Sequence, residues 1–480
     1  MMKNLLIIGA GDAGWRVIRE IQNHPELECQ IIGLIDDDPK KLNTEVMGVR
    51  VLGGRERIIE IGKKEKVDEI IIAIPSADGK TIREIINHCK ETRASFKIVP
   101  GILEILSGDV QLHQIREVES EDLLGRETVT ANIDEISNFL KGKRVLITGA
   151  AGSIGSELSR CVAKFSPGQL ILADHNENDL YLLYLSLKES VQAIPLIVDV
   201  RDGKRLEEIF KRFVPEIIFH SAALKHVPLM EENLMEAIKT NIFGTQLLSE
   251  LGERFACEKF IFISTDKASA PISVMGATKR VAESLFQLYT PTKQAYTPKF
   301  KQVYTPSKQK FFVVRFGNIL GSSGSVLPIF KSQIKRRVPL TITHSEASRY
   351  FMTSSEAVSL ILQAASLEAP SGRTYVLDMG EPVNITDLAK NLLILSSTEE
   401  IGIEYIGLRP GERLKEEDIR KGTEPTAFPK IFYKDQDPVK NPKHLIRKLH
   451  ILKSIIERDD TERAKEFLFE IVKFVDGVLQ

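Results

Sequence analysis

The sequence predicts an α/β protein built on two doubly wound parallel sheets, the second of which carries a smaller C-terminal lobe. Short apolar runs alternate with amphipathic helical patterns along most of the 480 residues, as they do in chains made of β-α-β units. The series of runs starts twice, and each time a glycine-rich turn follows the first run, at residues 9–14 and 149–155. Glycines in that position are typical of the first strand-to-helix turn of a doubly wound sheet.

The first series predicts an N-terminal domain at residues 1–112. Its apolar runs indicate four strands, at residues 4–11, 31–38, 69–76 and 96–101. The following segment, residues 113–141, is charged and less regular, and we interpret it as a connector.

The second series predicts a longer domain at residues 142–480. Its runs are rich in β-branched and aromatic residues and indicate six strands, each beginning with its run and ending before the polar or glycine residues that close it, within residues 143–152, 170–176, 195–200, 216–223, 259–266 and 311–318. After Gly317, further helices and short strands predict the smaller lobe, which we expect to bind substrate. Residues 289–309 hold three near-copies of YTPxKQ. These units are too short to stack as structural repeats and their prolines break a helix, so we expect a mobile loop.

The composition excludes several classes of protein. The 65 basic and 66 acidic side chains leave a formal charge of −1, so no basic field is available for nucleic acid or a membrane surface. Four scattered cysteines without a CxxC pair favour reduced thiols over a disulfide framework or a metal site. No signal-peptide pattern is visible, and no apolar stretch approaches the roughly 20 residues of a membrane helix. We therefore expect a cytoplasmic protein with no integral membrane segment and no metal.

The second glycine-rich turn, Gly149 to Gly155, predicts a dinucleotide site. Its glycines permit a tight turn and a close approach of the backbone to a pyrophosphate, and the following helix offers free N–H groups. Asp174 ends the next strand, where an acidic side chain can bind a ribose hydroxyl. That carboxylate favours NAD, with NADP as the alternative, because a 2′-phosphate would face like charge. The competing interpretation is that the glycines serve only the turn.

The first glycine-rich turn, Gly9 to Gly14, has a comparable partner in Asp36. No further chemistry follows it in the N-terminal domain. Two interpretations stay open, a nucleotide site and a retired site that survives as scaffold.

A polar cluster follows the fifth strand of the second series. Thr265, Asp266 and Lys267 come directly after that strand, and the carboxyl ends of parallel strands line the ligand crevice of such sheets. Thr and Asp also cap helices well, but capping does not call for Lys267. Further along, Met275 and Lys279 are four residues apart and share one face of a predicted helix.

Nine stretches, in order from about Lys141 to Glu412, carry a family resemblance: TGAAGSIGSEL, HSAALKHVPLME, NIFGT, STDKA, VMGATKR, VRFGNILGSSGSVLP, SRYFM, VLDMGEPV and LRPGE. The chain resembles the bacterial nucleotide-sugar 4,6-dehydratases of capsule and glycan biosynthesis, which are extended short-chain dehydrogenases/reductases. The stretch IREVESEDLLGR and the N-terminal domain resemble the longer members. The family's usual tyrosine is Met275 here, as it is in one branch. The membrane helices of many longer members are absent, so membrane attachment is not carried over.

The resemblance implies an NAD(P)-dependent dehydratase, a hydro-lyase acting on UDP-N-acetylglucosamine with retention of configuration at C5. It assigns Lys267 as the base at C5, Asp266 as the acid for the departing hydroxyl and Thr265 as a hydrogen-bond donor to the C4 oxygen. Lys279 would hold the nicotinamide ribose, and Met275 would be inert. A base must be neutral and an acid protonated, so the pocket must be desolvating.

The same resemblance, together with side-chain chemistry, defines two binding sets. The cofactor set comprises Gly149, Gly152, Ser153, Ile154, Gly155, Asp174, Asp199, Val200, Ala222, Ala223, Lys225, Asn241 and Lys279. The substrate set comprises Lys225, His226, Asn318, Ser325, Arg349, Arg409 and Glu412. The arginines suit a diphosphate because a guanidinium binds phosphate oxygens in pairs. The alternatives are a packed histidine at His226 and a surface salt bridge for either arginine.

Two other functions compete with dehydration. A nucleotide-sugar 4-epimerase shares the oxidation, but such enzymes normally rely on the tyrosine that is absent here and gain nothing obvious from Lys267. A cofactor-binding regulatory protein, decayed at Met275, is the third reading, and the retention of Thr265, Asp266, Lys267 and Lys279 argues against it. We also expect a homo-oligomer that pairs through helices flanking the second sheet.

Overall fold

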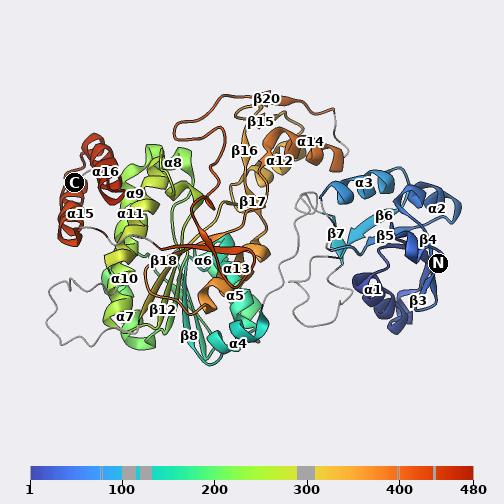
Figure 1. Ribbon diagram of the computed structural model, residues 1–480, viewed down its shortest axis with the longest axis horizontal. Coiled ribbons are helices and arrows are strands. Elements are labelled where there is room, and N and C mark those ends of the chain that lie inside the picture. The colour runs from blue at the N-terminus through green and yellow to red at the C-terminus, as the bar shows by residue number, and fades with distance from the viewer. Residues whose placement is uncertain are drawn as a thin grey trace. The chain divides into compact units, whose positions relative to one another are not determined.

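The computed structural model describes residues 2–75, 77, 79–99, 115–118, 132–288, 309–396, 398, 400–435, 439 and 441–478. The chain divides into two compact units (Figure 1). The N-terminal unit consists of Met1–Thr130 with Ile394–Ser397, and the C-terminal unit consists of Ala131–Leu393 with Thr398–Gln480. Most of the predicted connector and the YTPxKQ segment lie outside the described residues, although Gln309, the last residue of that segment, is buried.

The N-terminal unit holds a sheet in the order β3-β4-β2-β1-β5-β6-β7, in which the five inner strands run parallel and the two edge strands antiparallel. Its elements are β1 (Lys3–Ile8), α1 (Asp12–Asn23), β2 (Cys29–Ile35), β3 (Glu45–Val46), β4 (Val49–Gly53), α2 (Ile58–Lys64), β5 (Glu69–Ile72), α3 (Gly79–Lys90), β6 (Ser95–Ile98) and β7 (Arg116–Glu117). Leu5 and Ile7 pack into one core cluster and Leu6 and Ile8 into another. Successive residues of a strand face opposite sides, so this continuous apolar run is what a sheet covered on both faces requires.

The C-terminal unit holds a sheet in the order β10-β9-β8-β11-β12-β13-β18-β22-β21. The strands up to β18 are parallel, and β22 and β21 complete the edge in antiparallel pairing. Its strands are β8 (Arg144–Thr148), β9 (Gln169–Asp174), β10 (Ala193–Ile197), β11 (Ile217–His220), β12 (Lys259–Ile263), β13 (Lys310–Arg315), β18 (Arg373–Leu377), β21 (Glu424–Pro425) and β22 (Ile431–Asp435). The chain moves outward from β8 to β10, then returns to β11 beside β8. The strand order therefore reverses between β8 and β11, where such sheets bind ligands at their carboxyl ends.

Helices cover both faces of this sheet (Figure 1). They are α4 (Ile133–Leu140), α5 (Ser153–Ala163), α6 (Glu177–Leu187), α7 (Gly203–Phe213), α8 (Val227–Glu232), α9 (Leu234–Ile238), α10 (Thr245–Arg254), α11 (Val274–Leu288) and α13 (Ser354–Ser366). The smaller lobe contains α12 (Val326–Lys335), α14 (Ile385–Leu395) and three two-stranded sheets, β14 (Asn318–Ile319) with β17 (Phe351–Met352), β15 (Leu340–Ile342) with β20 (Ile403–Tyr405), and β16 (Ser348–Arg349) with β19 (Val383–Asn384).

A C-terminal helical hairpin packs against α11, as Figure 1 shows. It is formed by α15 (Pro442–Glu457) and α16 (Thr461–Val475). Leu449 and Leu468 belong to the same apolar cluster as Val281 and Leu285 of α11. All but two residues of α11 are consequently buried, so the helix that carries Met275 and Lys279 lies in the interior of the unit.

The predicted fold class is confirmed. The ten sequence runs correspond to strands β1, β2, β5, β6 and β8 to β13. Sequence reasoning missed the short edge strands β3, β7 and β21, because two residues are too few to show a period. Within the described residues, no helix combines the length and the apolar character needed to cross a membrane.

Candidate active site

The glycine-rich turn after β8 tolerates no side chain at two of its positions. Gly149 has a φ of +68°, and a Cβ there would lie 2.6 Å from the backbone nitrogen of Ala222. A Cβ at Gly155 would overlap the carbonyl oxygen of Gly149. Gly152 precedes α5 without a capping side chain, so the first N–H groups of that helix stay available to an acceptor. These features fit the pyrophosphate of a dinucleotide.

Asp174 lies beside this turn at the end of β9. Its Oδ2 accepts the N–H of Ala151 at 2.9 Å and its Oδ1 accepts the N–H of Asn176 at 2.9 Å, with the residue 7% exposed. Asp174, which is predicted to bind a ribose hydroxyl, therefore also holds the glycine-rich turn to β9. At the end of β10, Arg201 hydrogen-bonds to Asp199 and holds the pKa of that carboxyl below its ordinary value.

The predicted residues after β11 surround the same turn. Asn241 lies in the π-helical turn η7 (Lys239–Gly244). Its side-chain oxygen accepts the N–H of Leu224, and its side-chain nitrogen donates to the carbonyl oxygen of Leu224 and to Thr278 Oγ1. It thus fixes the loop whose Ala222 lies against Gly149. Val200 packs on Gly244 of η7.

The glycine-serine turn of residues 321–325 meets both predicted sets. Ser323 N–H donates to Ser153 Oγ of α5 at 3.2 Å. A Cβ at Gly324 would overlap the ring of His226, and burial lowers the pKa of that histidine. Ser325 precedes α12, and its buried hydroxyl has no hydrogen-bond partner. Ser153, His226 and Ser325, far apart in the sequence, therefore converge on one turn.

A compact hydrogen-bonded cluster lies at the end of β12 and is formed by Thr265, Asp266 and Lys267. Thr265 precedes the 3₁₀ turn η8 (Asp266–Ala268) and donates its hydroxyl to Asp266 Oδ1 at 2.7 Å. Asp266 Oδ1 also accepts the Lys267 N–H at 2.9 Å and lies 3.0 Å from Lys267 Nζ. The capping geometry expected of Thr265 is present together with an ion pair that capping does not require.

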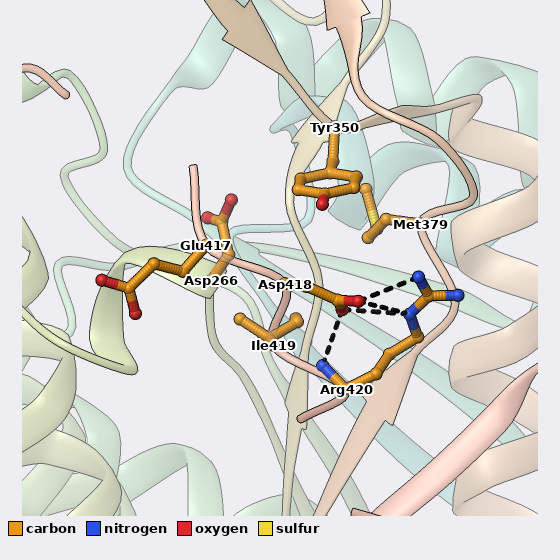
Figure 2. A pocket seen from close by; sticks show the side chains of 7 residues that line it. All are labelled: Asp266, Tyr350, Met379, Glu417, Asp418, Ile419 and Arg420. Atoms are coloured by element: carbon orange, nitrogen blue, oxygen red, sulfur yellow. Dashed lines mark hydrogen bonds and ion pairs between the residues drawn. The ribbon is translucent and has the colours of Figure 1, made fainter. Parts of the chain in front are cut away.

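Asp266 keeps one oxygen free at the edge of a pocket. Its Oδ2 is buried and has no hydrogen-bond partner. The pocket is lined by Asp266, Tyr350, Met379, Glu417, Asp418, Ile419 and Arg420. Figure 2 shows Tyr350 and Met379 above it and the ion pair of Asp418 and Arg420 below. A buried carboxylate oxygen without a partner is costly unless a ligand or a proton satisfies it, which makes this edge the place where Asp266 can react.

Lys267 has two further partners, which come from distant parts of the chain. Its Nζ lies 3.2 Å from Asn318 Oδ1 and 3.2 Å from Glu416 Oε1. Although burial by itself lowers the pKa of Lys267, Asp266 and Glu416 together hold it above its ordinary value. Without a ligand, Lys267 therefore carries its proton.

Two predicted substrate residues are paired with each other. Arg349 donates to Glu412 Oε1 at 2.8 Å and to the carbonyl oxygens of Ser348 and Leu414, and its Nε lies 3.5 Å from Glu416 Oε1. Arg409 and Lys225 are exposed and their side chains take no part in this network. Arg349 is thus held at the lysine cluster, whereas Arg409 lies at the surface.

Lys279 and Met275 lie on α11, behind the reactive cluster. Lys279 Nζ donates to the carbonyl oxygen of Ile263 at 2.6 Å and lies 4.0 Å from the ring centre of Phe262. Burial lowers its pKa to about 7. Met275 is 4% exposed within an apolar cluster that includes Met230, so its surroundings offer no route for a proton.

Sequence reasoning missed Glu416 and Tyr350. Glu416 follows the matched stretch LRPGE by four residues and Tyr350 lies inside SRYFM, but neither position showed by itself that it would meet the cluster after β12. A carboxylate four residues after Glu412 was the available signal.

The fold is that of the extended short-chain dehydrogenases/reductases, and the site brings a lysine and a carboxylate together at the end of a strand. A crystal structure of Pen from Bacillus thuringiensis is 33% identical, with a TM-score of 0.55, and the match covers 62% of this chain and 90% of Pen. The family model described as polysaccharide biosynthesis protein matches residues 145–435, and the model described as CoA-binding domain matches residues 2–100. The chain therefore belongs to the polysaccharide biosynthesis protein family.

Three characterised or probable relatives agree with this membership. A probable polysaccharide biosynthesis protein of Bacillus subtilis (strain 168) is 44% identical over 89% of this chain and 70% of its own length. A UDP-N-acetylglucosamine 4,6-dehydratase (inverting) of Campylobacter jejuni (strain 81-176) is 31% identical over 58% of this chain and 78% of its own length. A UDP-glucose 4-epimerase of Rickettsia bellii (strain OSU 85-389) is 33% identical over 56% of this chain and 76% of its own length. The resemblance to nucleotide-sugar dehydratases seen in the sequence is thereby confirmed.

Proposed function

We propose that this protein is a UDP-N-acetylglucosamine 4,6-dehydratase that uses bound NAD and retains the configuration at C5. The observation that carries the proposal is the cluster after β12, in which a lysine amine lies 3.0 Å from a carboxylate whose second oxygen is buried without a hydrogen-bond partner, on a residue that lines a pocket. Removal of water across C5 and C6 of a hexose needs a base and an acid close together, and this cluster supplies both.

The residues around the second glycine-rich turn fit the cofactor. Gly149 and Gly155 leave room for a pyrophosphate, and Asp174 presents a carboxylate where the adenosine ribose of a dinucleotide binds. Bound NAD would supply reversible storage of a hydride from C4, and the proton of the C4 hydroxyl would leave through an ordered water, because Asp266 is the protonated acid in this reaction. The ketone at C4 makes the neighbouring C5 hydrogen acidic. Lys279, with its pKa of about 7, suits a ribose contact that also lowers the local proton affinity.

One proton transfer would prepare both reactive groups. Lys267 must be neutral to accept the C5 proton, and Asp266 must be protonated to give a proton to the departing C6 hydroxyl. Moving a single proton across the 3.0 Å between them produces both states. Burial beneath a bound sugar favours such a neutral pair over two charges.

An epimerase is the second candidate, favoured by the similarity to the Rickettsia enzyme. Both reactions begin with oxidation at C4, but only dehydration uses a base for the C5 proton and an acid for the C6 hydroxyl, which Lys267 and Asp266 would supply. A regulatory protein without activity would have no use for the buried pairing of Asp266 with Lys267.

Purified protein incubated with UDP-N-acetylglucosamine tests the proposal by the mass of the product. Loss of one water supports the dehydratase, and the NMR coupling constants of the product sugar give its C5 configuration. An isomer of unchanged mass would instead support the epimerase. Absence of turnover with NAD still bound would support the regulatory protein.

A further inference from the structure

Glu416 reaches the cluster on a segment that is fixed at several points. Gly411 has a φ of +73°, and a Cβ there would lie 2.8 Å from Glu231 Oε1. Arg413 donates to the carbonyl oxygen of Ala270, and Lys415 forms an isolated parallel bridge with Ser348. The segment of residues 411–416 is thus held against α8, the loop before α11 and β16. This attachment delivers the next side chain, Glu416, to Lys267.

Two carboxylates and one amide contact the Lys267 amine, and an arginine lies behind one of the carboxylates. Asp266 on η8 and Glu416 contact it directly, at 3.0 and 3.2 Å, and the neutral amide of Asn318 on β14 completes the set. Arg349 on β16 lies 3.5 Å from Glu416 and is paired with Glu412. Glu416 is only 5% exposed, so it is a buried carboxylate shared between the lysine of the sugar site and an arginine.

Proton abstraction creates a charge that this environment must stabilise. When Lys267 takes the proton, the C5–H bond breaks, its electron pair passes into the enolate of the C4 ketone, and the neutral amine becomes an ammonium. A buried ammonium needs a fixed counter-charge. Asp266 cannot provide it, because in the proposed reaction it is the protonated acid. Among the described residues, Glu416 is the other carboxylate in contact with the amine.

We propose that Glu416 is a positioning residue whose carboxylate holds the Lys267 amine beside Asp266 and stabilises the ammonium that forms when Lys267 accepts a proton. The inference rests on the proposed function and adds to it the group that sets the strength of the base. Glu416→Gln keeps the size and the hydrogen-bonding capacity of the side chain and removes only its charge. Loss of that charge lowers the proton affinity of Lys267.

The first experiment measures the titration of Lys267 without any turnover. Competitive acetylation of the full-length protein at a series of pH values, read by peptide mass spectrometry, gives the reactivity of this one amine, whose side chain is 20% exposed. In Glu416→Gln, Lys267 becomes reactive at a pH about one unit or more below that of the wild type. Glu400→Gln is the matched control, because Glu400 is an exposed carboxylate of the same unit at 3.9 Å from Arg337. An unchanged titration of Lys267 in Glu416→Gln overturns the proposal.

The second experiment reads catalysis. Dehydration requires neutral Lys267, so in Glu416→Gln the acidic limb of the kcat profile moves to lower pH while kcat falls about 10²-fold and KM changes little. Glu416→Asp keeps the charge and retains the wild-type limb, which a purely structural role would not explain. A fall in kcat with the limb unmoved in both variants assigns Glu416 to structure and overturns the proposal. Absence of turnover in the wild type would contradict the proposed function, and the acetylation result would still decide whether Glu416 controls Lys267.

Discussion

At the scale of single residues, the proposed reaction depends on whether one proton lies on Lys267 or on Asp266. Lys267 carries it in the absence of a ligand, held by Asp266 and Glu416. The proposed reaction begins when it lies on Asp266 instead. In the proposed reaction Met275 moves no proton, so the proton transfers at C5 and C6 fall to Lys267 and Asp266, with Thr265 hydrogen-bonded to the C4 oxygen.

Substitution of the base should separate the two halves of the reaction. We expect Lys267→Met to slow exchange of the C5 hydrogen with solvent by about 10²–10⁴ while the cofactor is still reduced by substrate. Deuterium incorporation measured by mass spectrometry and the absorbance of reduced nicotinamide report the two steps separately. Undiminished exchange in this variant would remove Lys267 from the role of base.

Lys279 should make stability depend on pH. Its pKa is about 7 in the folded protein and near 10.5 when unfolded, so between these values the unfolded chain binds one more proton and stability rises with pH. Lys279→Met should reduce that slope by up to about 1.4 kcal/mol per pH unit. Denaturant unfolding from pH 7.5 to 9.5 measures it, with Lys211→Met as control because that lysine is 64% exposed. Equal slopes in the wild type and Lys279→Met would contradict the lowered pKa.

At the scale of elements, the glycine-rich turn and the helix after it form one packed unit. Gly155→Ala forces a methyl group onto the carbonyl of Gly149, so we expect a loss of about 1–3 kcal/mol and of NAD binding. Gly203→Ala is the matched control at the start of α7, where a Cβ would make an ordinary 3.4 Å contact with Leu247. Thermal unfolding with and without NAD compares the two. Equal behaviour of both variants would show that the close approach is unimportant.

The C-terminal hairpin stabilises the helix that carries Lys279. Leu449 of α15 is 1% exposed in the cluster with α11, whereas Ile451 of the same helix is 41% exposed. Truncation of a buried leucine removes contacts that the surroundings cannot replace, so Leu449→Ala should cost about 2–5 kcal/mol. Ile451→Ala should cost well under that. Chemical denaturation of the full-length protein measures both, and similar losses would mean that the hairpin is not part of the core.

At the scale of the whole molecule, the two units repeat one turn. A Cβ at Gly14 would overlap the carbonyl of Gly9, as at Gly155. Asp36 Oδ2 accepts the N–H of Ala10 at 2.8 Å, as Asp174 accepts that of Ala151 at 2.9 Å. In the N-terminal unit Lys41 also pairs with Asp36, at 2.9 Å. The nucleotide and scaffold interpretations of this unit both stay open.

Because each unit has its own apolar clusters, we expect two calorimetric transitions. Asp36→Asn should lower the midpoint temperature of only one transition, and Asp174→Asn that of only the other. Each substitution removes a charged hydrogen-bond acceptor and should reduce the free energy of unfolding of its own unit by about 1–3 kcal/mol. A shared shift in both variants would show that the units unfold together. The predicted homo-oligomer stays a prediction.

Much of this protein could be predicted from local patterns. Strands and glycine turns were predictable because both depend on neighbouring residues in the sequence. The run of Thr265, Asp266 and Lys267 at a strand end was predictable for the same reason. Contacts formed across the fold were not. Glu416 lies far from Lys267 in the sequence, so no local pattern shows that the two side chains meet, and the pairing of Arg349 with Glu412 likewise joins residues that are distant along the chain.

The sequence by itself determined the two doubly wound sheets, the order of their strands along the chain and the chemical groups at the strand ends, because periodicity and turn chemistry are local. Only the tertiary structure decided which of those groups touch. It placed Glu416 on Lys267, left one oxygen of Asp266 free at a pocket, and enclosed Lys279 so that its pKa falls to about 7. Proton affinity depends on burial and on charges a few ångströms away, and both are properties of the folded chain.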